Sequence, residues 1–233
     1  MRRKTPPPRP IDPYAAMSLS SEVGVVDSAD VEATIQDHFD EVRGCYARAG
    51  KAQKYAGGKV LLRFLIAGDG AAQDVWVLES SLGNYDVERC LVEVGRRMVF
   101  DAPIGNKATT FDYPVEFRST NQLAVLDIDG MKIDHDVASF RPQLSACGQL
   151  AKDGAIAIMY IEPNGVPGSV GLAATTEIDE DVGECIVKTI RRWRMSATLP
   201  GHALRATFNI PPVTVSAAER RAASSVAAHR THR

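Results

Sequence analysis

The sequence lacks any long apolar run, and this absence argues against a membrane-spanning helix within it. Its longest apolar stretch, Ala155 to Ile161, is far shorter than the roughly 20 residues that a helix needs to cross a bilayer. The amino-terminal end is charged but has no apolar core, so residues 1–21 do not form a complete secretory signal. The prolines between Pro6 and Pro13 instead predict a stiff polyproline II spacer. We therefore expect the chain to be the carboxyl-terminal part of a longer, membrane-anchored protein.

The local patterns that carry catalysis or cofactor binding are also missing. None of the five histidines lies beside a serine or cysteine nucleophile in a known arrangement. Gly68-Asp69-Gly70 and Gly165 to Gly168 lead into predicted strands, so neither matches a phosphate-binding loop. Asp127-Ile128-Asp129-Gly130 resembles part of a calcium loop but lacks the downstream bidentate glutamate. We expect no cofactor, no metal and no enzymatic activity, and an unrecognised active site is the least favoured alternative.

The chain has little excess charge of either sign, since its formal net charge is only -2, but the charged residues are unevenly distributed along it. Basic residues gather near the amino terminus and after residue 215, which leaves the middle of the chain with a net charge of about -9. A nucleic-acid-binding core is normally basic, so we expect no nucleic-acid partner for the folded part. The apolar content of 45% and charged content of 24% are typical of a chain that folds around a packed core.

The four cysteines indicate an internal repeat. Cys45 and Cys90 are followed by Cys147 and Cys185 at a similar interval. A shift of the chain by about 95 positions superposes identical residues from the first half on the second. The matching pairs are Ile66 and Ile161, Gly70 and Gly165, Val75 and Val170, Asp86-Val87 and Asp181-Val182, Cys90 and Cys185, Val92 and Val187, and Arg96-Arg97 and Arg191-Arg192. These identities predict two tandem copies of one module, with a shorter first loop in the second copy.

Apolar periodicity predicts the same order of elements in each copy, namely helix, strand, strand, helix, strand. In the first copy the predicted elements are a helix at 31–49 capped by Ser28 or Asp30, strands at 59–67 and 75–78, a helix at 86–98 and a strand at 109–117. In the second copy they are a helix at 133–151 interrupted by Pro142, strands at 155–161 and 166–173, a helix at 178–193 and a strand at 204–210. The predicted fold class is α+β, with two tandem modules that each carry a small antiparallel sheet.

The module boundaries follow from these elements. We predict a Pro-rich basic linker at 1–27, a first module at 28–118, an inter-module linker at 119–131, a degenerate second module at 132–214 and a basic tail at 215–233. Leu123 to Leu126 is a candidate short strand within the linker.

In each copy, both cysteines fall on apolar faces of the two helices, and these faces cover the same side of one sheet. A disulfide between Cys45 and Cys90, and another between Cys147 and Cys185, is the favoured interpretation. Buried free thiols remain as an alternative, and zinc is the least favoured because no C-x-x-C pair is present. Such a disulfide would stabilise each module by roughly 3 to 4 kcal/mol and would imply an oxidising compartment.

Several short segments of the first copy together resemble the AgmX/PglI-type C-terminal domain, a TonB-C-like module of myxobacterial envelope and gliding-motility proteins. The segments are Cys45-Tyr46, Gly58-Lys59-Val60, Asp69-Gly70, Ser80-Ser81-Leu82, Asp86 to Cys90, Arg96-Arg97 to Phe100, and Tyr113 to Phe117. The second copy departs from this pattern, for example with Gly148 in place of the tyrosine after the cysteine. The resemblance therefore applies mainly to residues 31–117.

The resemblance implies a non-catalytic, periplasmic interaction module in machinery for energy transduction, gliding motility or adhesin transport. Its partners would be envelope proteins, with a segment of an outer-membrane protein among the candidates, and membrane contact would be indirect or through an anchor outside this chain. TonB-like modules can bind a partner's extended segment along an edge strand. The runner-up interpretation is a purely architectural envelope protein whose modules pack on each other without a transient ligand.

Pro114 makes the last strand of the first copy a candidate for such an edge, because proline removes a ladder donor and is tolerated mainly at sheet edges. Strand addition would supply main-chain hydrogen bonds, and alternate side chains would give selectivity. The side chains in question are those of Thr109, Phe111, Tyr113, Val115 and Phe117. The alternative is that the other module covers this strand. The sequence predicts no oligomeric state.

Overall fold

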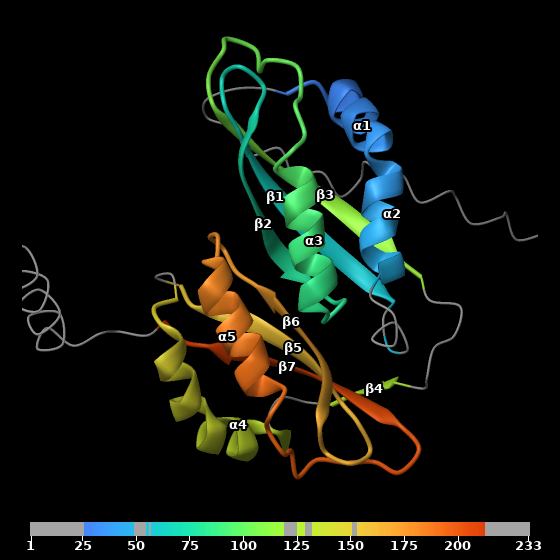
Figure 1. The fold of residues 1–233 in the computed structure, drawn as a ribbon, viewed down its shortest axis with the longest axis vertical. Helices are drawn as coiled ribbons and strands as arrows, with labels where there is room; N and C mark the ends of the chain where they lie inside the picture. The colour runs from blue at the N-terminus through green and yellow to red at the C-terminus, as the bar shows by residue number, and fades with distance from the viewer. Residues whose placement is uncertain are drawn as a thin grey trace, which may run out of the picture.

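The computed structural model describes residues 26–48, 55, 57–118, 125–128, 132–150 and 153–212. Most of the predicted Pro-rich linker, parts of the inter-module linker and the basic tail lie outside these residues. The described residues form an α+β structure with two small sheets, stacked end to end along the long axis of the molecule (Figure 1). Each sheet belongs to a large hydrophobic core of its own. None of the helices in this described part combines the length and apolar character that crossing a bilayer requires.

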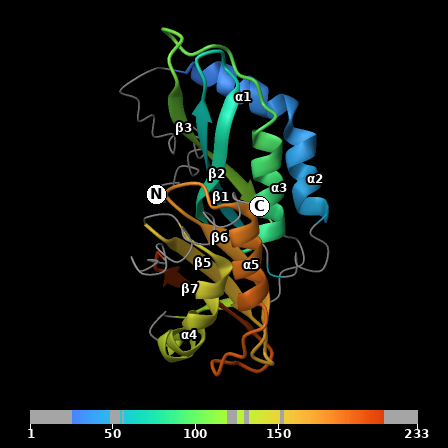
Figure 2. The same cartoon turned by 60° about the vertical axis from the view of Figure 1, so that its left-hand side comes forward.

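The first half has a three-stranded antiparallel sheet in the order β2-β1-β3. Its elements are α1 (Ser28–Asp37), α2 (Phe39–Arg48), β1 (Gly58–Ile66), β2 (Ala72–Ser80), α3 (Tyr85–Gly95) and β3 (Thr109–Phe117). The alternating apolar residues of β1 and β2 face the helices, because Val60, Leu62, Phe64, Val75 and Val77 join Leu91 and Val94 of α3 in one core. One face of the sheet thus packs under the helical layer, as Figure 2 shows from the side.

The prediction of a single helix at 31–49 is wrong, because two helices, α1 and α2, meet there at His38. The His38 main-chain N–H donates to the carbonyl of Ile35, and its ring Nδ1 lies 2.9 Å from the carbonyl oxygen of Thr34. Both contacts are with the last turn of α1, which ends there. The cap is also one residue earlier than predicted: Asp27 accepts a hydrogen bond from the Ala29 N–H at 2.7 Å. Phe39, the first residue of α2, is 47% exposed.

The second half has a four-stranded sheet in the order β4-β7-β5-β6. Its elements are β4 (Val125–Asp127), α4 (Asp134–Phe140), β5 (Ala155–Ile161), β6 (Pro167–Ala173), α5 (Glu180–Ile190) and β7 (Ala203–Ile210). The long helix predicted at 133–151 stops at Phe140 and continues as a 3₁₀ helix from Arg141 to Cys147, because Pro142 cannot donate an α-helical hydrogen bond. The short strand suggested at 123–126 is observed as β4, within the predicted inter-module linker.

Strand pairing follows the same spacing in the two halves. Phe64 of β1 lies opposite Phe111 of β3, and Met159 of β5 lies opposite Ala206 of β7. Both partners are shifted by the 95 positions of the sequence repeat. We therefore treat β5, β6 and β7 as the counterparts of β1, β2 and β3, while the repeat itself stays a prediction.

Candidate functional site

The cysteines are paired as predicted. Cys45 and Cys90 form a disulfide between α2 and α3 with a Cα–Cα distance of 5.6 Å. Cys147 and Cys185 form a second one between the 3₁₀ helix and α5 with a Cα–Cα distance of 5.4 Å. The free-thiol and zinc alternatives are thereby set aside for these four residues. Each disulfide fixes the first helical segment of its half to the helix that packs on the sheet.

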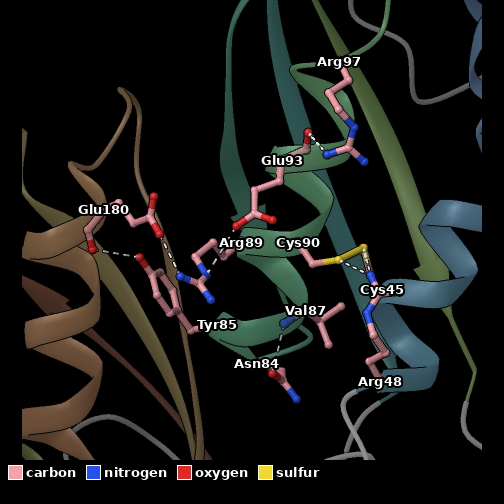
Figure 3. A network of polar contacts seen from close by, with 10 residues as sticks. All are labelled: Cys45, Arg48, Asn84, Tyr85, Val87, Arg89, Cys90, Glu93, Arg97 and Glu180. Atoms are coloured by element: carbon pink, nitrogen blue, oxygen red, sulfur yellow. Dashed lines mark hydrogen bonds and ion pairs between the residues drawn. A yellow bond between two sulfur atoms is a disulfide. The ribbon is translucent and has the colours of Figure 1, made fainter.

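The two disulfides differ in their polar surroundings. Arg48, at the end of α2, places Nη2 2.9 Å from Sγ of Cys90 and 3.8 Å from Sγ of Cys45 (Figure 3). The contact recorded for the second disulfide is with a neutral group, the Thr189 hydroxyl, 3.7 Å from Sγ of Cys147. A guanidinium stabilises a thiolate far better than a hydroxyl does. Among the described residues, the first disulfide therefore has a cation beside it.

The predicted partner-binding strand is β3, and the structure places it at the outer end of the first sheet. The side chains proposed for selectivity point mostly into the protein: Thr109, Phe111 and Phe117 are buried, while Tyr113 and Val115 are half-buried. Phe111 stacks on Phe64 with ring centroids 4.9 Å apart. Side-chain selectivity through these five residues is therefore restricted, whereas main-chain pairing is unaffected by their burial.

The opposite face of β3 carries Asp112 and Pro114. Asp112 is buried and forms a bidentate ion pair with Arg63 of β1, with N–O distances of 2.6 and 2.7 Å. This hydrogen bond raises the pKa of Arg63 above its ordinary value. Pro114 lies opposite Leu61 of β1. Because proline has no N–H, Pro114 fits a position whose main-chain groups point away from β1. Alternate residues along β3, counted from Pro114, therefore also direct their main-chain groups away from β1.

The second sheet shows what occupies the corresponding edge. There β4 runs parallel to β7, with Val125, Leu126 and Asp127 opposite Ala203, Leu204 and Arg205. The Ile128 N–H donates to the Arg205 carbonyl at 3.0 Å, and Asp127 forms a two-pronged ion pair with the Arg205 guanidinium. The pair lowers the pKa of Asp127. An extended segment of this chain thus adds a strand to the counterpart of β3.

The two halves meet along a seam between β2 and β6, and not at β3. The Ala174 N–H donates to the Val77 carbonyl at 3.0 Å, and the Ser169 hydroxyl donates to the Gly83 carbonyl at 2.6 Å. Ala173 belongs to the core of the first half, and Tyr85 of α3 packs against the core of the second. Among the described residues, the second half thus packs on the edge of the first sheet opposite to β3.

Glu88 of α3 lies at the centre of this seam and is 1% exposed. Its carboxylate accepts hydrogen bonds from the Ser80 hydroxyl at 2.7 Å, the Asn84 N–H at 3.3 Å and the Leu172 N–H at 2.9 Å. Leu172 is in β6, so the carboxylate takes the place of a strand partner at that edge. Burial raises the pKa of Glu88 to about 7, although the hydrogen bonds act in the opposite direction.

Ion pairs surround the seam at the surface. Arg89 pairs with Glu180 at 2.7 Å, Arg191 pairs with Asp86 at 3.2 Å, and Arg96 pairs with Glu177. The Tyr85 hydroxyl donates to the Glu180 carbonyl at 3.4 Å, and burial raises its pKa to about 12. Asp179 caps α5, whereas Glu177 and Glu180 reach across to the first half.

Sequence reasoning missed the seam, although three signals for it were present. Glu88 interrupts an otherwise apolar face of α3, and Gly171 interrupts an apolar strand. A Cβ on Gly171 would lie 2.7 Å from Gly83 Cα and 2.8 Å from Asn84 N, so the two halves approach there with no room for a side chain. A Cβ on Gly183 would likewise collide with the Tyr85 ring, at 3.0 Å from Cζ.

No protein-family model, curated protein or solved structure matches this chain. The functional conclusion therefore depends on the geometry of the sheets and on the sequence resemblance.

Proposed function

We propose that this chain is a non-catalytic protein–protein interaction module of a cell-envelope complex for energy transduction or gliding motility. It binds an extended segment of an envelope partner by strand addition at β3. The observation that carries the proposal is β4, which adds a parallel strand to β7, the counterpart of β3. In the second half, a strand of the same chain pairs with this edge of the sheet. In the first half, a partner's segment pairs with the equivalent edge.

The spacing of the two halves indicates where the partner pairs. Ala203 to Arg205 of β7 correspond to residues 108–110, at the start of β3. The carbonyl of Arg205 points toward β4, and Ala108, the counterpart of Ala203, has the same parity as Pro114 and as the counterpart of Arg205. These main-chain groups point away from β1, so they are the ones with which an added strand can pair. Because β4 already occupies the second sheet, we assign partner binding to the first half alone.

The two disulfides support a location in an oxidising compartment, for which we propose the periplasm. The resemblance to TonB-C-like modules supports the same location and supports envelope proteins as partners, including an outer-membrane protein segment. The seam favours a second candidate function, a purely architectural protein. Its halves bind each other through Glu88, Ser169 and three ion pairs, and such a protein would need no transient ligand.

A site-specific photo-cross-linker at the exposed Lys107, in the full chain expressed in its native host, separates the two functions. The interaction module gives one dominant covalent partner. Ala108→Pro removes a main-chain donor at the proposed contact and should abolish the cross-link, whereas Ala108→Val should retain it.

Circular dichroism and the melting temperature establish that both variants are folded. The proposal is wrong if folded Ala108→Pro cross-links as the parent does. An absence of any partner at Lys107, and also at exposed control positions such as Asp40, favours the architectural function.

A further inference from the structure

Glu88 is a buried carboxylate that touches both halves of the molecule. It accepts hydrogen bonds from β2 through Ser80, from the start of α3 through Asn84 and from β6 through Leu172. Within the described part of the chain, no arginine or lysine donates a hydrogen bond to it. A buried carboxylate without a cation is costly when ionised, and neutral donors offset only part of that cost.

The charged and titratable groups around Glu88 do not replace the missing cation. On α3 itself, Asp86 is negative and the Arg89 guanidinium is directed to Glu180 (Figure 3). Glu177, before α5, and Glu180, the first residue of α5, are each paired with an arginine. From β5, the Tyr160 hydroxyl donates to the Ser81 carbonyl, and Tyr160 has a pKa raised by burial. The groups of β2 and β6 that contact Glu88 are neutral.

Opening the seam would expose an ionised Glu88 to bulk water. The backbone of Gly171 lies against Gly83 and Asn84, so the closed seam leaves no space for hydration on that side. On the other side, a cavity of about 60 Å³ adjoins Glu88 between α3 and the segment leading to α5. That volume admits about two water molecules. Separation of β6 from α3 would hydrate the carboxylate and release the N–H groups of Leu172 and Ala174.

We infer that the seam between the two halves is a proton-responsive joint, closed when Glu88 is protonated and loosened when Glu88 is ionised. Burial disfavours the charged form, and this cost is relieved when the two halves part and the carboxylate reaches bulk water. The joint therefore binds a proton as it closes, and the second half is released from the β2 edge as that proton leaves. This inference does not depend on partner binding at β3.

The sign and size of the effect follow from the pKa of Glu88. In the closed joint the pKa is about 7, above its ordinary value of 4.5, so the closed form binds the proton more tightly. The stabilisation by protonation is complete below pH 4.5 and is lost as the pH rises through 7. Between pH 5.5 and pH 8, linkage between these two pKa values increases the opening equilibrium about 30-fold.

Amide hydrogen exchange of the full chain, measured by NMR with the disulfides intact, tests the inference. The Leu172 and Ala174 amides report opening of the seam, and the Phe64 amide in the central strand β1 reports unfolding of the first half. After correction for intrinsic exchange, protection of Leu172 and Ala174 should fall by about 30-fold from pH 5.5 to pH 8. Protection of Phe64 should change much less.

Glu88→Gln is the matched variant, because its amide oxygen still accepts the Leu172 hydrogen bond but does not titrate. It should show nearly pH-independent protection at the seam. If this variant does not fold, the ¹³C shift of the Glu88 carboxyl in the parent protein provides the titration directly. Three results would each overturn the inference: a parent change below about threefold, an equal change at Phe64, or a carboxyl that titrates near 4.5.

Discussion

The guanidinium of Arg48 lies 2.9 Å from the sulfur of Cys90, where the disulfide ties α2 to α3. Reduction of this disulfide creates a thiolate beside a positive charge, which stabilises the reduced form. We therefore expect Arg48→Gln to make Cys45–Cys90 harder to reduce, lowering its reduction potential by about 10 to 30 mV. A titration against glutathione, with alkylation and mass spectrometry, measures this.

Cys147–Cys185 in the same molecule is the internal reference for that titration, and its potential should not change. Arg43→Gln is the matched control, because Arg43 is exposed on the same helix and lies over the Phe39 ring. An identical potential in the parent and Arg48→Gln would show that the guanidinium contact has no effect on the sulfur.

Loss of either disulfide should destabilise the chain substantially. The bonds close loops with sequence separations of 45 and 38 residues. The loop-closure model then gives about 4 kcal/mol for each. We expect Cys45→Ser/Cys90→Ser and Cys147→Ser/Cys185→Ser each to lower the free energy of unfolding by roughly 3 to 4 kcal/mol, measured by urea denaturation. A loss below 1 kcal/mol would indicate that the helices stay in place without the covalent bond.

Gly171→Ala should weaken the contact between the halves and leave the second sheet intact. The added Cβ meets backbone of the first half at 2.7 and 2.8 Å, and backbone cannot move aside as a flexible side chain can. We expect a loss of about 2 to 3 kcal/mol. Chemical shift changes should concentrate at residues 81–88 and 169–174.

Gly168→Ala in the same strand is the control for that experiment. The three atoms nearest to its Cβ all belong to the Glu162 side chain and none to backbone. It should change the melting temperature by no more than a few degrees. Equal effects of the two substitutions would mean that β6 itself, and not the seam, is sensitive to alanine.

The docking of β4 on β7 should depend on Asp127. Its ion pair with Arg205 lowers its pKa, so the pair contributes above the ordinary pKa of 3.8 and is lost as the pH falls further. Asp127→Asn should increase exchange of the Ile128 amide, which donates to Arg205. The overall melting temperature should hardly change because the pair is largely exposed. Unchanged exchange at Ile128 would show that main-chain pairing alone holds β4.

Strand positions were the most predictable part of the fold. β3 and β5 begin and end at the predicted residues, because their apolar residues form patterns bounded by turn residues. The break at His38 was not predictable, since apolar residues continue at helical spacing from Ile35 through Val42 across it. Pro142, by contrast, has a direct steric consequence, and the interruption that it predicts is observed.

The contacts between the halves could not be derived from local patterns. Nothing in the spacing of Glu88 or Leu172 says that they meet, because their contact depends on which sheet edges pack together. A glutamate on an apolar helix face is equally typical of a residue at the margin between the core and the solvent. The disulfides were predictable because two cysteines on facing helices have few other partners. The edge position of β3 was predictable for a similarly local reason, the missing N–H of Pro114.

The pairing of β4 with β7 also shortens the tether between the two halves. β3 ends at Phe117 and β4 begins at Val125, so eight peptide units separate them. A fully extended chain of that length spans about 29 Å at most. Each half consequently meets the other at a high effective concentration, on the order of millimolar or above. A joint with weak intrinsic affinity can therefore reclose after each opening without any help from the protein concentration.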